Sequence, residues 1–135
     1  MGSQQLLLIA VGLVIIGIMI AVGITMFSDQ ATSNNRDEVA NDLAHFAALA
    51  RAYYRRPAVF GGGQNSFRGL TMGRITSRPQ NDNGTYSLAP DPVPAGVDHV
   101  TLTGLGTQTG FDGTNVRVVM LVYADSVKVD ESLTN

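Results

Sequence analysis

The residues that could do chemistry are few and widely separated in this chain. The 135 residues contain two histidines, His45 and His99, and no cysteine. A zinc site draws three or four ligands from Cys, His, Asp and Glu at characteristic spacings, and with no cysteine neither histidine belongs to a set of that spacing. We therefore expect no metal site, and we interpret both histidines as solvent-facing or hydrogen-bonded.

Two short stretches have some of the composition of ligand-binding loops. The stretch GLGTQTG (104–110) has the glycines of a phosphate loop, but no helix is predicted after it, as a phosphate loop requires. We interpret it as the connection of a β-hairpin. The stretch FDGTN (111–115) carries side-chain oxygens without the spacing of a calcium loop. The sequences GxSxG and GxxxxGK do not occur, so we expect neither an enzyme nor a bound cofactor.

Two further motifs concern partners and modification. The stretch RAYYRRP (51–57) interleaves Arg with Tyr, which also suits nucleic acid. The formal net charge of −2 offers no general attraction to a polyanion. We therefore interpret these arginines as cations at a helix C-terminus, and we expect no nucleic-acid partner. Asn83-Gly84-Thr85 matches the N-glycosylation sequon, which makes Asn83 a possible glycosylation site.

The most prominent feature is a run of 22 residues, 6–27, without one charged side chain. As a helix it is roughly 33 Å long, enough to cross the hydrocarbon core of a bilayer. A cleaved signal peptide fits poorly, because nothing basic precedes the run and it exceeds the usual 7–15 apolar residues. A membrane anchor and the inner strip of an assembly both remain open.

Small side chains recur on one face of this run. Spacings of three, four and seven return to the same face of a helix, and small residues on such a face let helix backbones approach closely. Membrane helices are also rich in Gly and Ala for general reasons, so both readings stay open. The small residues of this face are Ser3, Ala10, Gly17, Ala21 and Ser28, and together with Gln5 they are the candidate packing residues of the filament core.

A second, amphipathic pattern follows the apolar run, with steps of four and three residues. Its apolar members are Val39, Leu43, Phe46, Ala50 and Tyr53. A helix could begin afresh near Asn35, where Asn35 and Glu38 resemble an N-terminal cap. It could also continue from the first run, because no proline interrupts residues 1–56. Pro57 and the glycines at 61–63 end it in either case.

The C-terminal half is strand-like. Alternating or β-prone residues predict strands over 84–89, 98–106, 116–124 and 126–131. The stretch 106–115 is expected to be a turn, and the proline-rich stretch 89–96 irregular. We therefore predict an α+β fold in which a long N-terminal helix, 1–56, is capped by a globular β head, 57–135. A three- or four-stranded antiparallel sheet would pack on the 39–53 face of the helix.

This architecture resembles that of type IV pilins and archaeal-type pilins. The resemblance covers the whole architecture, and its most specific part is the first 27 residues. It implies a subunit whose apolar half-helices (6–27) bundle into a filament core, with the sheet domains outside and a membrane-inserted stage before assembly. The implied partners are copies of the chain in a helical homopolymer and the pilus assembly machinery. The implied location is an extracellular filament, with adhesion or surface motility as downstream roles.

The sequence departs from the pilin pattern in three places. If Met1 is the first mature residue, Gln5 stands where the family has a glutamate that neutralises a neighbour's amine. Val22 and Gly23 stand where the family has a kinking proline, and no basic leader precedes Met1. The chain is then either already mature or cut elsewhere, for instance after Gly2. Gln5 is expected to serve as an uncharged acceptor for the N-terminal amine.

The leading interpretation is a structural subunit of a pilus-like filament. The alternative is a single-pass membrane protein whose external β domain binds a ligand or partner, or a minor component of a pilin-related secretion machine.

Overall fold

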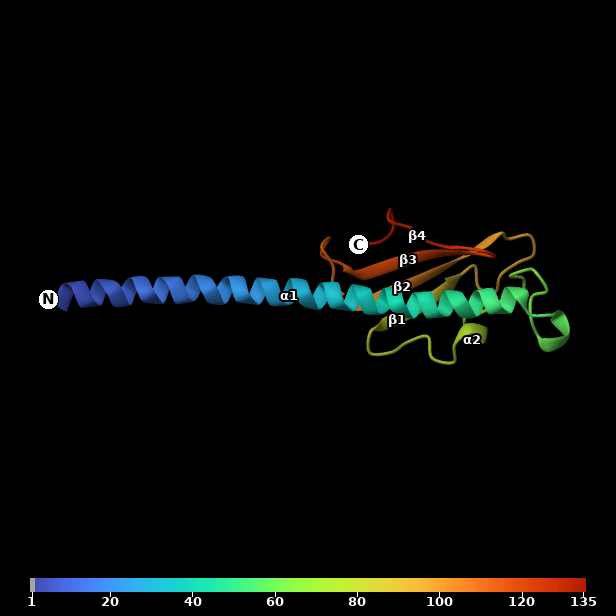
Figure 1. Ribbon diagram of the computed structural model, residues 1–135, viewed down its shortest axis with the longest axis horizontal. Helices are drawn as coiled ribbons and strands as arrows, with labels where there is room; N and C mark the ends of the chain where they lie inside the picture. Colours follow the sequence, from blue (N-terminus) through green and yellow to red (C-terminus); the bar gives the residue numbers. More distant parts are fainter. Residues whose placement is uncertain (1) are drawn as a thin grey trace.

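The computed structural model describes residues 2–135, and it has the shape of a rod with a head at one end (Figure 1). Helix α1 (Gly2–Arg55) is the rod and also the spine of the head. A 3-10 turn (Ala58–Phe60) and a short helix α2 (Met72–Ile75) lead into strands β1 (Gly84–Ala89), β2 (His99–Thr109), β3 (Asn115–Tyr123) and β4 (Val127–Val129). The fold is α+β, as predicted.

Helix α1 is continuous over 54 residues, which at 1.5 Å per residue is about 80 Å. No second helix begins at Asn35, so the capping interpretation is wrong. Asn35 lies inside the helix with its side chain buried, because that side chain finds its partners in the sheet. The helix ends at Arg55, two residues before Pro57, because proline lacks the backbone N–H that would continue the hydrogen bonds of the helix.

The four strands form one antiparallel sheet in the order β1-β2-β3-β4, packed along the second half of α1 (Figure 1). Strand β1 has the predicted bounds. Strand β2 runs to Thr109, beyond the predicted end at residue 106, and its pairing with β3 shifts between Leu105 and Thr109. The turn between β2 and β3 is therefore shorter than expected.

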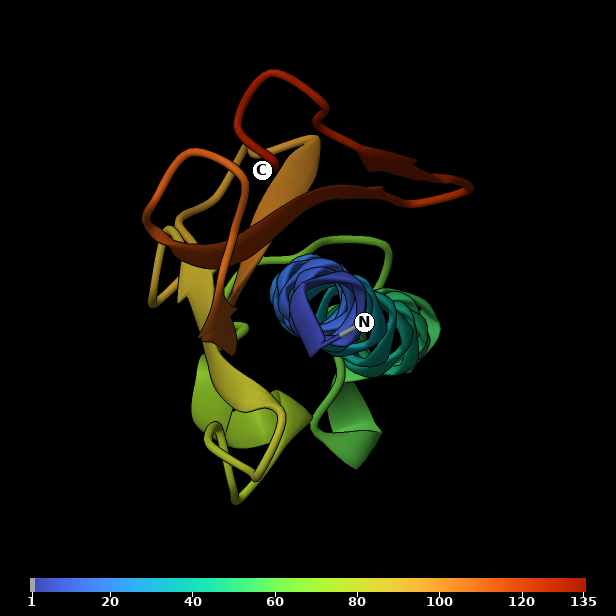
Figure 2. The same ribbon diagram turned by 90° about the vertical axis from the view of Figure 1, so that its left-hand side faces the viewer.

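The core lies between the sheet and one stripe of α1. Viewed along the rod, the sheet covers one side of the helix only (Figure 2). The five residues of the predicted stripe, Val39, Leu43, Phe46, Ala50 and Tyr53, are all buried in this core. The connection between α1 and β1 adds Phe67 and Leu70, both fully buried.

Two glycines of the stretch 104–110 lie in β2 and face the helix, so interpreting the whole stretch as a hairpin connection is wrong. A Cβ at Gly104 would lie 2.5 Å from Val39 Cγ1, and one at Gly106 would lie 2.1 Å from Asn35 Oδ1. Both distances are shorter than van der Waals contact. The glycines therefore let β2 approach the helix more closely than any other residue would.

Candidate assembly surface

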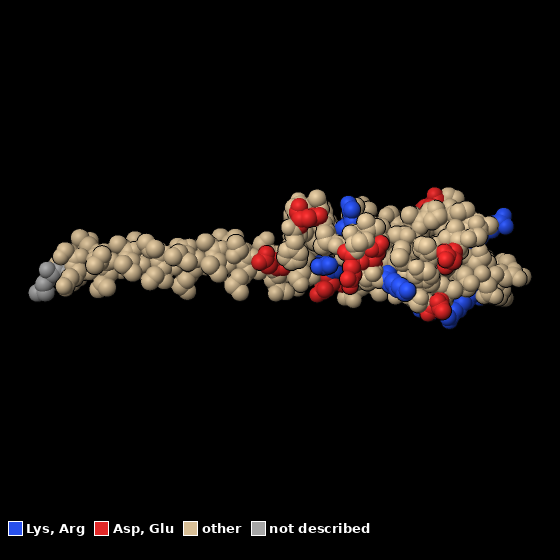
Figure 3. Space-filling view, turned by 90° about the horizontal axis from the view of Figure 1, so that it is seen from above, with Lys and Arg blue, Asp and Glu red and all other residues tan. Residues whose placement is uncertain are grey.

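The N-terminal half of α1 projects from the head without any cover. Its large apolar side chains are exposed, from Leu6 at 69% to Phe27 at 78%. This part of the rod carries no Lys, Arg, Asp or Glu before Asp29, and Figure 3 shows it free of charged side chains up to the head. The helix is long and apolar enough to cross a membrane. Such a surface is unstable in water and requires lipid or other apolar helices around it.

All six candidate packing residues are exposed on this projecting segment. Within the described residues, none of them is brought against another part of the chain. A Cβ added at Gly17 would meet nothing within 4 Å, and the same holds at Gly12 and Gly23. The partner expected for Gln5, the amino group of Met1, lies outside the described residues.

Continuity of α1 sets the direction of the small-residue face relative to the head. Gly17, Asn35 and Tyr53 are spaced 18 residues apart, which is five turns of an α-helix. Asn35 and Tyr53 are buried against the head. Gly17 therefore lies on the same side of the helix as the sheet, and a helix packing at Gly17 approaches from that side.

The side chain of Asn35 joins the helix to the near end of the sheet. Its Oδ1 accepts hydrogen bonds from the backbone N–H groups of Thr107 (3.0 Å) and Gln108 (3.2 Å), and its Nδ2 donates to the carbonyl of Asn83 (2.8 Å). One turn earlier, Thr32 Oγ1 donates to the carbonyl of Thr109 (2.9 Å). These contacts hold the end of β2 and the turn before β1 against the helix.

A second polar link lies next to it, around the carboxylate of Asp42. Oδ2 of Asp42 accepts hydrogen bonds from Tyr86 Oη (2.5 Å), Asn81 Nδ2 (2.8 Å) and Asn83 Nδ2 (3.0 Å). Burial raises the pKa of Asp42, but these three hydrogen bonds outweigh it and hold the pKa below its ordinary value. Burial and the hydrogen bond to Asp42 raise the pKa of Tyr86. The carboxylate therefore stays ionised at neutral pH.

These two links fix the second half of α1 against the sheet, and the unbroken helix continues from there into the projecting segment. The predictions from sequence did not include Asn35 or Asp42 as linking residues. A polar residue in line with an apolar stripe was the available signal for Asn35, since it lies four residues before Val39. No comparable signal marked Asp42.

The other motifs occupy structural positions. Asn83 lies in the turn before β1, where its amide nitrogen donates to Asp42; its glycosylation stays a prediction. In the stretch 51–57, Tyr53 is buried and its hydroxyl donates to the carbonyl of Arg68 (2.7 Å). His99 lies 2.7 Å from Asp98. Among residues 2–135, no three His, Cys, Asp or Glu side chains are grouped as metal ligands would be.

No protein-family model matches the chain, and neither a curated protein nor a solved structure does.

Proposed function

We propose that this chain is the structural subunit of a pilus-like extracellular filament, in which the projecting half of α1 packs with copies of itself. The observation that carries the proposal is the single unbroken helix, exposed and apolar in its first half and packed into a folded head in its second. A flexible tether would be enough to keep a domain near a membrane. A rigid connection is needed when the position of each helix must set the position of its head.

The composition of the projecting segment supports packing between helices. Leu, Ile, Val and Met cover most of its surface, with Ala10, Gly17 and Ala21 along one face. Helices that pack in an apolar environment gain little from hydrophobic burial alone, and close backbone approach at small residues supplies the remaining contact energy. The segment is also long enough to span a bilayer before assembly.

The second candidate is a single-pass membrane protein with an external β domain, because the same segment meets the requirements of an anchor. The two candidates differ in where the chain is found. Cells expressing the chain are sheared, and the released material is pelleted and viewed by electron microscopy. Filaments that contain the chain support the first candidate. Recovery of the chain only from detergent-extracted membranes supports the second.

A substitution at Gly17 tests the packing face itself. Gly17→Leu is expected to abolish filaments while leaving the head folded, because a Cβ at this position has nothing within 4 Å but a leucine there blocks close approach of a second helix. Gly12→Leu is the matched control: it makes the same change on the same segment, five residues or about 140° around the helix from Gly17. Equal filament yields from the two variants would remove Gly17 from the packing face.

A further inference from the structure

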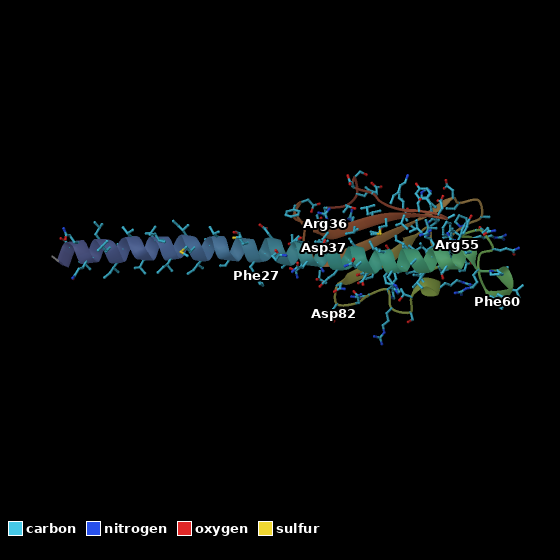
Figure 4. All side chains as sticks on the ribbon, viewed as in Figure 1. Phe27, Arg36, Asp37, Arg55, Phe60 and Asp82 are labelled. Atoms are coloured by element: carbon cyan, nitrogen blue, oxygen red, sulfur yellow. The ribbon has the colours of Figure 1, made fainter. Side chains whose placement is uncertain are left out.

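The end of the head farthest from the N-terminus, which we call the tip, is basic and apolar. Residues 51–74 carry five arginines and no Asp or Glu. Directly after α1, Val59 and Phe60 are exposed by 91% and 75%. Figure 4 shows Phe60 at the extreme end of the molecule, beyond Arg55. An exposed aromatic next to an exposed aliphatic residue, surrounded by cations, is typical of a contact surface.

The opposite end of the head, which we call the neck, is acidic and also carries exposed aromatic residues. Residues 28–42 contain four acids and one arginine. Phe27 is exposed by 78%, and Phe111, in the β2–β3 hairpin, by 74%. The bond from Thr32 to Thr109 places this hairpin at the neck. Figure 4 shows Asp37 and Asp82 at this end of the head, together with Arg36, and Phe27 on the helix just before it.

Among residues 2–135, neither the arginines of the tip nor the acids of the neck form an ion pair. Across residues 2–135 the one ion pair within 4.0 Å joins Asp98 and His99. Three acids lie near the tip as well, on loops at the strand ends, but Asp98 is paired and Asp91 accepts a hydrogen bond from the backbone N–H of Met72 (3.4 Å). Asp125 is the third. Asp42 of the neck is held by its hydrogen bonds within the head, and Arg74 of the tip donates to the carbonyl of Gly61 (3.1 Å). Arg55 and Arg56 of the tip and Asp37 and Glu38 of the neck are the charges that can act on something outside the chain.

We infer that the tip of one copy docks on the neck of the next, with Phe60 and Val59 against the apolar residues of the neck and Arg55 and Arg56 facing Asp37 and Glu38. This inference rests on the proposed function and deepens it, because it names the head-to-head contact of the filament. The two surfaces are different, so the contact is heterologous. A heterologous contact that does not close on itself produces an open helical polymer rather than a dimer.

The dimensions of the helix are compatible with this contact. From Thr32, its first buried residue, to Arg55 the helix has 24 residues, or about 36 Å. If one copy is shifted by that length along the helix axis, toward the N-terminus of its neighbour, its tip lies level with the neighbour's neck. The projecting segment 2–28 is roughly 40 Å long, so copies at intermediate shifts still overlap along their apolar helices.

The absence of cysteine in the native sequence makes crosslinking a direct test. Filaments of the full chain carrying Phe60→Cys and Phe111→Cys together are treated with a flexible bismaleimide and analysed by denaturing gel electrophoresis. We expect a ladder of covalent trimers and higher multimers, and no ladder from either single variant. Phe60→Cys with Leu133→Cys is the matched control, because Leu133 is exposed at a hollow on the outer face of the sheet.

Charge reversal tests the electrostatic part. Arg55→Glu with Arg56→Glu is expected to lower the pelleted filament fraction roughly tenfold, because acids then face acids across the contact. Asp37→Arg with Glu38→Arg should have a similar effect, and the four changes together should restore most of the yield. Arg117→Glu, a single reversal on β3, should leave the yield close to that of the parent.

The outcomes separate this inference from the proposed function. If filaments form but crosslinking yields no ladder, the tip-to-neck contact is overturned and the filament proposal stays intact. The same conclusion follows if the variant with all four charge reversals assembles no better than the poorer of the two double variants. If the parent chain releases no filaments on shearing, the proposed function fails and the inference fails with it.

Discussion

Replacing Asn35 with alanine should weaken the packing of the sheet on α1. Asn35 is 5% exposed and makes three hydrogen bonds across the interface between α1 and the sheet. Alanine would leave two backbone N–H groups and one carbonyl without their partner. The helix itself should persist, because alanine is the best helix former.

The magnitude follows from the groups left unpaired. A buried polar group without a partner costs about 1–3 kcal/mol. Thr107 and Gln108 are surface residues, so water reaches them in part and the lower end applies to each group. The sum is about 3 kcal/mol. For a head of this size 1 kcal/mol corresponds to about 4 °C in Tm, which predicts a fall of about 12 °C.

The assay uses the full chain in detergent micelles. All four tyrosines lie between Tyr53 and Tyr123, within the head, so near-ultraviolet circular dichroism follows unfolding of the head and not of the apolar segment. Hydrogen exchange at the amides of Thr107 and Gln108 should accelerate by about a hundredfold, the factor equivalent to 3 kcal/mol.

Asn34→Ala is the matched control, since Asn34 is exposed and its Oδ1 accepts a bond only from Gln30, on the same helix (2.8 Å). If Asn35→Ala melts within about 4 °C of Asn34→Ala, equivalent to 1 kcal/mol, or if exchange at both amides is unchanged, the link between helix and sheet is not held by Asn35 and the reasoning is refuted.

Three other predictions address different parts of the molecule. Gly104→Ala should destabilise the head by about 1–3 kcal/mol in the same melting assay, because its Cβ would overlap Val39; Gly12→Ala, with open space around it, should not. The folded-state pKa of Asp42 is lowered, so the ionised carboxylate stabilises the head fully above the ordinary carboxyl pKa of about 3.9, and this stabilisation is lost as pH falls through the lowered pKa. Asp42→Asn should therefore flatten the decline of Tm below pH 4. If Tm declines equally steeply in that variant, the Asp42 carboxylate is not the cause of the decline. Gln5→Leu should reduce filament yield if Gln5 accepts a hydrogen bond from the N-terminal amine, and Gln5→Glu should make assembly pH-dependent between about pH 3 and 6, the range around an ordinary Glu pKa; parental yields from Gln5→Leu would remove that role.

Local patterns in the sequence were enough to determine the elements and their faces. The period of the apolar residues from Val39 to Tyr53 is a property of neighbouring residues on one helix, so it identified the buried stripe without knowledge of the sheet. The Asn-Gly turn signal marked the start of β1, and Pro57 marked the end of α1. The exposed apolar segment was equally visible, because its length and composition do not depend on the fold.

Contacts between distant residues were decided only by the tertiary structure. Asn35 resembled a helix cap because its partners, 72 and 73 residues away, cannot be inferred from its neighbours. Gly104 and Gly106 resembled a turn because a glycine required by close packing has the same sequence signal as one required by a bend. The neck likewise becomes one surface only when the antiparallel strands return the hairpin at Phe111 to the acidic part of the helix.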